Sequence, residues 1–221
     1  MVNAVHAEDS SSASVNSTVC IEKIEWTSVS ILKIYLAEGP SFFVRDVYLS
    51  SFPPELLTPD SILGEAETET LVHAGRIYLA ERSAMEYLAR SEQCRFSLSP
   101  KLYKKDFTLD EINPALDYLE QRGMLDDARF ASAWLRNRSI HQSEGRQKLL
   151  AGLLSRGIAG SIARQALDAY FEVMDEKALC KNAAEKMIRI GKKEEKLAIA
   201  LARKGFSLRI ITECLKSIKK Q

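Results

Sequence analysis

Positive charge recurs beside helix-ending residues in this 221-residue chain. Three segments place a basic residue directly before a glycine or an aspartate. They are Lys105–Asp106, Arg156–Gly157 and Lys204–Gly205, with Lys104 and Arg203 as second cations in two of them. One explanation is that a cation in the last helical turn offsets the negative helix end by about 0.3–1 kcal/mol. The other is a basic stripe that binds a polyanion or an acidic protein surface.

The basic pairs belong to a segment that occurs three times. An apolar residue is followed after five positions by Phe or Ile, after five more by a small or branched apolar residue, and after four more by Leu. The copies are Leu102, Phe107, Ile112, Leu116; Leu153, Ile158, Ala163, Leu167; and Leu201, Phe206, Ile211, Leu215. Their spacing of 51 and then 48 residues predicts repeated supersecondary units.

Each copy carries the signals of a helix, a tight turn and a second helix. Glycine accepts the left-handed conformation that closes a helix, and Asp106 is a weaker substitute. The Phe or Ile that follows can fill the angle between the two helices. Thr108 and Glu111 have capping-box spacing at the next helix start, and Ser207 can cap the third copy. A further helix is predicted before each copy, at about residues 70–91, 126–140 and 175–190.

The region before the repeats has strand signals instead. Leu32, Ile34 and Leu36 alternate with polar or aromatic residues, and a second short strand pattern follows Gly39 and Pro40. We expect a small antiparallel sheet of about three strands, followed by a proline-containing loop at residues 50–61. The Ser-rich start of the chain predicts a disordered tail.

These patterns predict a mainly α protein preceded by a small antiparallel β segment. The expected parts are a tail at residues 1–20, a β-rich domain at 21–66, and helical repeats at 70–123, 124–173 and 174–221. Charge divides along the same lines, although the whole chain carries only +1. Residues 1–95 contain 7 Lys+Arg and 14 Asp+Glu, whereas residues 96–221 contain 24 and 16, so the repeats are basic. This favours an anionic partner.

Several function classes are disfavoured. The four cysteines and three histidines are too widely spaced for a disulfide framework or a metal site, which indicates reduced cytosolic thiols. No apolar run approaches the roughly 20 residues of a membrane span, and the N-terminus does not resemble a signal peptide, so we expect a cytoplasmic protein.

An enzyme is also disfavoured. The segment "IGKKEEK" lacks the glycine and Ser/Thr spacing of a phosphate loop. Tyr103 and the pair Asp126/Asp127 could take part in catalysis, but helix capping explains the pair better. We therefore predict no catalytic residue, no metal and no cofactor.

The segment "YLEQRGMLDDARFASAWLRNRS" resembles a signature of the RecX regulatory proteins. Its matching residues are Gly123, Met124, Leu125, Asp126, Asp127, Phe130 and Ala131. "SRGIAGSIARQAL" and "RKGFSLRIITECL" are similar to the second and third repeats of that family, and "AMEYLARSEQCRFSLSPKLYKKDF" resembles the first. The resemblance covers about residues 70–219, and the β-like segment at 21–45 resembles the extension of longer members. Asp106 departs from the family's usual glycine.

The resemblance implies three tandem three-helix repeats that form an elongated, curved array. It implies a negative regulator of RecA that binds the RecA–DNA filament in its helical groove. Such a protein lowers recombinase, ATPase and coprotease activities in DNA repair and the SOS response. Expected partners are the RecA filament and, weakly, single- or double-stranded DNA, with no membrane and a monomeric state.

The predicted contact surface consists of the basic turns and the cations near them. These residues are Lys101, Lys104, Lys105, Arg146, Lys148, Arg156, Arg203 and Lys204. An alternative is a stand-alone helical-repeat protein that binds DNA or acts as a scaffold, since a helix–turn–helix with glycine in its turn is also found in DNA-binding proteins. Whether the protein inhibits or stimulates its RecA is open at the sequence level.

Overall fold

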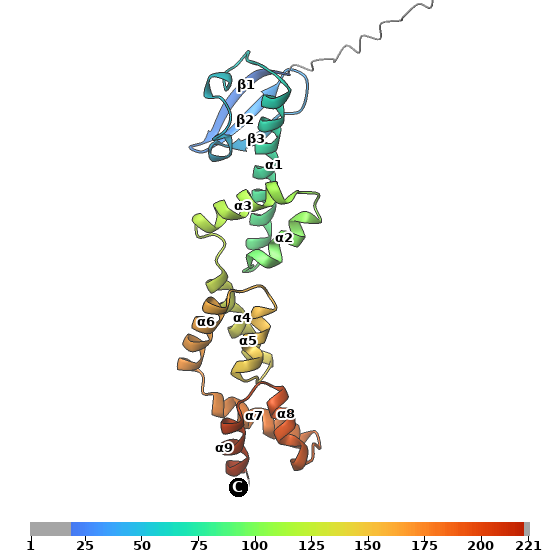
Figure 1. Ribbon diagram of the computed structural model, residues 1–221, viewed down its shortest axis with the longest axis vertical. Coiled ribbons are helices and arrows are strands. Elements are labelled where there is room, and N and C mark those ends of the chain that lie inside the picture. The colour runs from blue at the N-terminus through green and yellow to red at the C-terminus, as the bar shows by residue number, and fades with distance from the viewer. Residues whose placement is uncertain (1–18, 219–221) are drawn as a thin grey trace, which may run out of the picture. The chain divides into compact units, whose positions relative to one another are not determined.

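The computed structural model describes residues 19–218, apart from the side chain of Glu194. The chain divides into two compact units, of which the first ends at Leu79 and the second begins at Ala80. The boundary falls inside α1 (Glu65–Leu88), so this helix contributes to both units (Figure 1). The predicted tail at 1–20 lies outside the described residues, except that Val19 and Cys20 begin the first strand.

The first unit contains a four-stranded antiparallel sheet with the strand order β3-β2-β1-β4. Its strands are β1 (Val19–Ser28), β2 (Ile31–Leu36), β3 (Phe42–Arg45) and β4 (Ile62–Leu63). The sequence predicts about three strands, and β4 is the addition. Because β4 has only two residues, paired with Val19 and Cys20, it is too short to show an alternating pattern.

The alternation in β2 has the expected physical cause. Leu32 and Ile34 are buried on the face of the sheet that packs against Leu71 and Ala74 of α1. Gly75 allows this close approach, because a Cβ there would lie 2.8 Å from the ring of Phe42. Two short 3₁₀ turns, Asp46–Leu49 and Pro54–Leu56, link β3 to β4.

The second unit is helical. After the last part of α1 it contains α2 (Arg95–Tyr103), α3 (Leu109–Gln121), α4 (Asp127–His141), α5 (Arg146–Leu154), α6 (Gly160–Val173), α7 (Glu176–Arg189), the short 3₁₀ turn η3 (Glu194–Lys196), α8 (Leu197–Arg203) and α9 (Leu208–Ile218). The described part of the chain thus holds nine α-helices and one sheet, which confirms the predicted fold class. No helix among these residues is long and apolar enough to cross a membrane.

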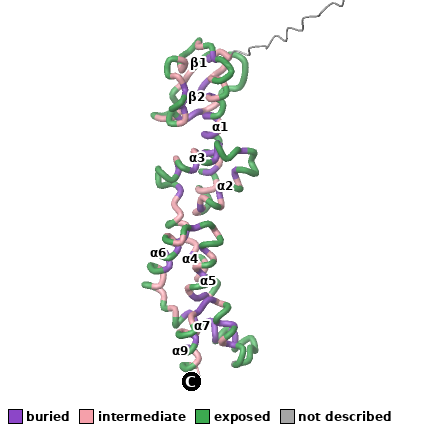
Figure 2. Tube along the Cα trace, in the orientation of Figure 1, coloured by how far each residue is buried: buried purple, intermediate pink, exposed green. Residues whose placement is uncertain are grey.

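The helices pack in groups that match the repeated segments. In the second group, α4, α5 and α6 bury Leu135, Leu153 and Leu167; in the third, α7, α8 and α9 bury Cys180, Leu201 and Ile211. The residue expected to fill the angle is buried in all three copies, as Phe107, Ile158 and Phe206. Figure 2 shows buried positions recurring along each helical group. We call Phe107, Ile158 and Phe206 the plug residues, because each is buried between the two helices that its turn connects and fixes the angle between them.

Candidate functional site

The three basic turns share one backbone geometry. Asp106, Gly157 and Gly205 have positive φ angles of 63°, 75° and 84°. In each turn the plug residue donates its backbone N–H to the carbonyl five residues earlier, at 3.4, 3.3 and 3.3 Å. This is the hydrogen bond of a left-handed helix end, and it confirms that Asp106 takes the place of a glycine. The predicted caps are also present, since Thr108 N–H donates to Glu111 Oε2 at 2.8 Å and Ile210 N–H donates to Ser207 Oγ at 3.4 Å.

In the first turn, two of the predicted lysines lie against an aromatic ring. The ammonium groups of Lys101 and Lys105 lie 5.1 and 5.3 Å from the ring centroid of Tyr87 on α1. Lys101 also donates to Gln93 Oε1 at 2.6 Å, and Lys105 pairs with Glu86 at 3.4 Å. Lys104 is exposed and has no ion pair among the described residues. It is the cation of this turn that is most accessible to a partner.

In the second turn, Arg156 is held close to its own repeat. Its guanidinium lies 4.7 Å from the Trp134 ring centroid and donates to the carbonyl of Gly152 at 2.8 Å. The backbone carbonyl of Arg156 accepts the thiol hydrogen of Cys94 at 3.4 Å. A side chain from the first repeat is thus bonded to the turn of the second.

The third turn lies beside a buried carboxylate. Glu144 is 3% exposed and accepts hydrogen bonds from Arg138 at 2.7 and 3.0 Å, and Lys148 pairs with it at 3.1 Å. Burial by itself would raise the pKa of Glu144, but the hydrogen bonds from Arg138 and Lys148 outweigh it and lower the pKa below the ordinary value. Lys204 donates its ammonium to the carbonyl of Ser143 at 3.2 Å. Lys148 and Lys204 are therefore brought together, and both have structural contacts.

Arg146 has a structural role that is repeated in the first helical group. Its guanidinium binds Asp168 on α6 and lies 5.5 Å from the Phe171 ring centroid. Arg95, 51 residues earlier, binds Asp117 on α3 at 2.7 Å, and Asp117 is likewise 51 residues before Asp168. Both arginines thus join the second helix of a repeat to the third. This shared offset was visible in the sequence, but the partners could be recognised only in three dimensions.

The remaining predicted cation, Arg203, is exposed and has no ion pair among the residues that the structure describes. Of the eight predicted residues, Lys104 and Arg203 can therefore meet a partner without breaking any of the ion pairs, side-chain hydrogen bonds or ring contacts described above. That any of the eight contacts a filament or DNA stays a prediction.

The acidic signature is a connector between repeats. Asp126 caps α4, because its Oδ1 accepts the N–H groups of Ala128 and Arg129 at 2.8 and 3.0 Å. Asp127 instead accepts the N–H of Arg95 at the start of α2, at 3.1 Å. The expectation that both carboxylates cap helices is correct, but the second caps a helix of the preceding repeat.

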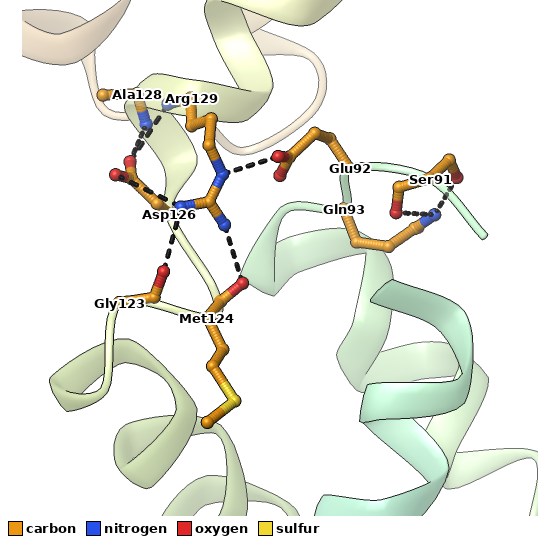
Figure 3. Close-up of polar contacts among 8 residues, drawn as sticks. All are labelled: Ser91, Glu92, Gln93, Gly123, Met124, Asp126, Ala128 and Arg129. Atoms are coloured by element: carbon orange, nitrogen blue, oxygen red, sulfur yellow. Dashed lines mark hydrogen bonds and ion pairs between the residues drawn. The ribbon is translucent and has the colours of Figure 1, made fainter. Parts of the chain in front are cut away.

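Arg129 completes this connector and was not recognised in the sequence. Its guanidinium donates to the carbonyls of Gly123 and Met124 at 2.9 and 2.7 Å and to Glu92 Oε1 at 2.5 Å (Figure 3). One side chain therefore ties the α3–α4 loop to the α1–α2 loop. The Gly123–Ala131 motif is thereby explained as a structural junction, with its polar groups used in capping and bridging.

A family model described as "RecX, second three-helix domain" matches residues 126–167. A curated relative, "Regulatory protein RecX" of Treponema pallidum (strain Nichols), is 39% identical over 142 residues, which cover 64% of this chain and 87% of the relative. This chain belongs to the RecX family. The RecX protein of Chlorobaculum tepidum is 32% identical over 140 residues, covering 61% of this chain and 85% of its own. RecX proteins are regulatory proteins rather than enzymes.

Two solved RecX structures share the fold. "Crystal structure of regulatory protein RecX" matches with a TM-score of 0.71 and 24% identity, covering 89% of this chain and 98% of the other. RecX from Lactobacillus salivarius matches with a TM-score of 0.58 and 23% identity, covering 66% and 98%. The sequence relatives confirm the predicted family resemblance. The two structures confirm the fold, the first over most of the chain.

Proposed function

We propose that this protein binds the RecA–DNA filament and lowers its recombinase, ATPase and coprotease activities in DNA repair and the SOS response. The observation that carries the proposal is the recurrence of one turn geometry, with a cation directly before the left-handed residue, in three successive repeats. A partner with a regular repeat of its own can meet such a set of turns through several weak contacts. Those contacts add through effective concentration.

The proposal extends to the surroundings in which the protein works. Membership of a family of regulatory proteins supports action on another protein rather than on a small-molecule substrate. We expect it to act as a monomer in the cytoplasm, where RecA and chromosomal DNA are present. Direct binding to DNA alone is the weaker of the two contacts.

A pair of charge reversals tests the proposal. Lys104→Glu combined with Arg203→Glu should weaken co-sedimentation with RecA filaments and reduce the inhibition of RecA ATPase, because both cations are exposed and unpaired among the described residues. The matched control is Arg164→Glu combined with Lys216→Glu. It makes the same change in net charge at exposed positions on α6 and α9.

The outcomes separate the two candidate functions. Full inhibition by a folded Lys104/Arg203 variant, or equal losses in the control, would contradict the proposed surface. A wild-type protein that binds bare DNA and does not co-sediment with RecA filaments would instead support a stand-alone DNA-binding or scaffold protein.

A further inference from the structure

Three lysines line a hollow on the surface of the helical unit. Of the three basic turns, only the third contributes a residue to this hollow, through Lys204. The hollow has a volume of about 310 Å³ and lies between the end of α4 and the helices α7 and α8. Lys186, Lys192 and Lys204 line it together with His141, and the apolar side chains of Ala183 and Met187 form part of its wall. Lys186 and Lys192 are absent from the predicted contact surface, because no repeated offset marks them.

The lysines come from different local structures that hold them apart. Lys186 lies in the last turn of α7, and Lys204 is the residue that follows α8. Lys192 follows Gly191, whose φ of 83° reverses the chain, and its N–H donates to the carbonyl of Met187 at 3.0 Å. The three cations therefore approach the hollow from separate backbone positions, as needed to surround an anion.

Nearby carboxylates do not neutralise these cations. Glu144 is already bonded to Arg138 and Lys148, and Glu185 pairs with Lys181 at 3.9 Å. Neither Lys186 nor Lys192 forms an ion pair with any residue that the structure describes.

The excess of positive charge around the hollow affects the pKa of Lys204. Burial lowers its pKa first, and repulsion from Lys148, Lys186 and Arg138 lowers it further, against the opposing attraction of Glu144.

The negative ends of three helices offset only part of the positive charge of the lysines. His141 ends α4, Ile190 follows α7 and Lys204 follows α8, and all three residues line the hollow. Each helix end carries about −0.5 of an elementary charge, so together they offset roughly half of three ammonium groups. The remaining positive charge is suited to an anion that enters from outside.

We propose that this hollow binds a backbone phosphate of single-stranded DNA. Lysine ammonium groups bind phosphate oxygens as point charges, and contacts to phosphates set the position of a protein on a nucleic acid without reading its sequence. The inference rests on the proposed function, in which the protein contacts a filament that contains DNA. It adds a DNA site on the third helical group to the basic turns.

The test uses the full-length chain and a fluorescein-labelled oligodeoxythymidine, with affinity measured by fluorescence anisotropy over a series of salt concentrations. Lys186→Gln combined with Lys192→Gln should weaken binding by about tenfold at low salt. The slope of log affinity against log salt should become shallower by about 0.7 for each phosphate that the variant no longer neutralises. Arg164→Gln combined with Lys216→Gln removes two exposed cations elsewhere and should change both quantities little.

Circular dichroism establishes that both variants are folded. Unchanged affinity and slope in the Lys186/Lys192 variant, or an equal loss in the control, would overturn the phosphate site. Saturable binding of inorganic phosphate that fails to compete with the oligonucleotide would overturn it as well, because the hollow would then hold a free anion.

Co-sedimentation with RecA filaments distinguishes this site from the proposed function. A Lys186/Lys192 variant that binds the oligonucleotide more weakly but still binds filaments supports the site. It also shows that RecA supplies the main contact with the filament. Wild-type protein that sediments with filaments but binds no oligonucleotide overturns the site alone. Wild-type protein that binds the oligonucleotide but not filaments removes the RecA proposal, and a loss of that binding in the Lys186/Lys192 variant then supports the site.

Discussion

The residue with positive φ decides how each basic turn is built. An L-residue in the left-handed region costs roughly 1–2 kcal/mol, and aspartate adopts it more readily than most. Gly157 and Gly205 also sit where another repeat packs closely. A Cβ on Gly157 would overlap the Phe96 ring, and a Cβ on Gly205 would overlap the backbone nitrogen of Lys148. The first turn thus tolerates aspartate, whereas the other two require glycine for two separate reasons.

The first prediction compares these positions. Asp106→Gly should raise the free energy of unfolding by about 0.5–1 kcal/mol, because glycine relieves the strain of the left-handed conformation. Gly157→Ala should lower it by more than about 1 kcal/mol, through strain and overlap with Phe96 together. Urea denaturation measures both. A stabilising Gly157→Ala variant would show that the turn does not need its glycine.

The buried carboxylate Glu144 predicts a dependence of stability on pH. Because the pKa of Glu144 is lower in the folded chain, its contribution is fully present above the unfolded pKa of about 4.3 and is lost as pH falls through the folded pKa. Glu144→Gln should therefore lower stability at neutral pH and reduce the fall in stability as pH decreases below about 4.3. Denaturation at several pH values measures this. Glu172→Gln, on an exposed residue of α6, is the control and should keep the acid response of the wild type.

At the scale of elements, carboxylates cap helices across repeat boundaries. Asp127 at the start of α4 accepts the N–H of Arg95 at the start of α2, and Glu176 at the start of α7 accepts the N–H of Arg146 at the start of α5, at 2.9 Å. The turn carbonyls add to this junction, because the N–H groups of Gly145 and Gln147 donate to Lys204 and Gly205 at 2.9 and 3.1 Å. The second and third repeats therefore each supply hydrogen-bond acceptors to the start of the second helix of the repeat before them.

Variants of the neighbouring residues Asp126 and Asp127 test whether a carboxylate of one repeat caps a helix of the repeat before it. Asp127→Ala should speed hydrogen exchange at the Arg95 amide and cost about 1 kcal/mol, since it uncaps α2. Asp126→Ala should instead speed exchange at the amides of Ala128 and Arg129 and leave Arg95 protected. Exchange measured by NMR distinguishes the two. Equal effects of both variants on α4 alone would contradict capping across the repeat boundary.

At the scale of the molecule, the two compact units carry opposite charge. Residues 1–79 have 4 Lys+Arg and 11 Asp+Glu, a net charge of −7, and residues 80–221 have 27 and 19, a net charge of +8. The basic turns and the lysine-lined hollow all belong to the second unit. Contacts with an anionic partner are therefore expected to be concentrated in the helical unit.

The last prediction concerns how distant turns combine. Lys104→Glu and Arg203→Glu should each weaken filament binding by about fivefold, or roughly 1 kcal/mol, as expected for an exposed charge contact. The double variant should lose close to the product of the two factors, because Lys104 and Arg203 lie in different repeats and share no described contact, and residues without a shared partner act independently. Co-sedimentation at several RecA concentrations measures the three affinities. A double variant no weaker than one single variant would mean that only one turn meets the filament.

The sequence by itself determined the features that depend on near neighbours in the chain. The three corners with their buried plugs, the left-handed Asp106 and the Thr108–Glu111 capping box are encoded within a few residues, so spacing alone revealed them. Family membership followed from the same local motifs.

Only the tertiary structure decided what the polar side chains contact. Arg129 binds Glu92, 37 residues away, and Lys204 binds Ser143, 61 residues away, and no local pattern encodes such distant pairs. Of the cations predicted as one surface, Arg146 and Lys148 form ion pairs within the second repeat, and Lys204 bonds the third repeat to the second. Lys101, Lys105 and Arg156 lie against aromatic rings, and Lys104 and Arg203 remain exposed without an ion pair among the described residues. The physical reason is that a charged side chain binds the groups that lie within hydrogen-bond distance after folding, and these groups can be far away in the sequence.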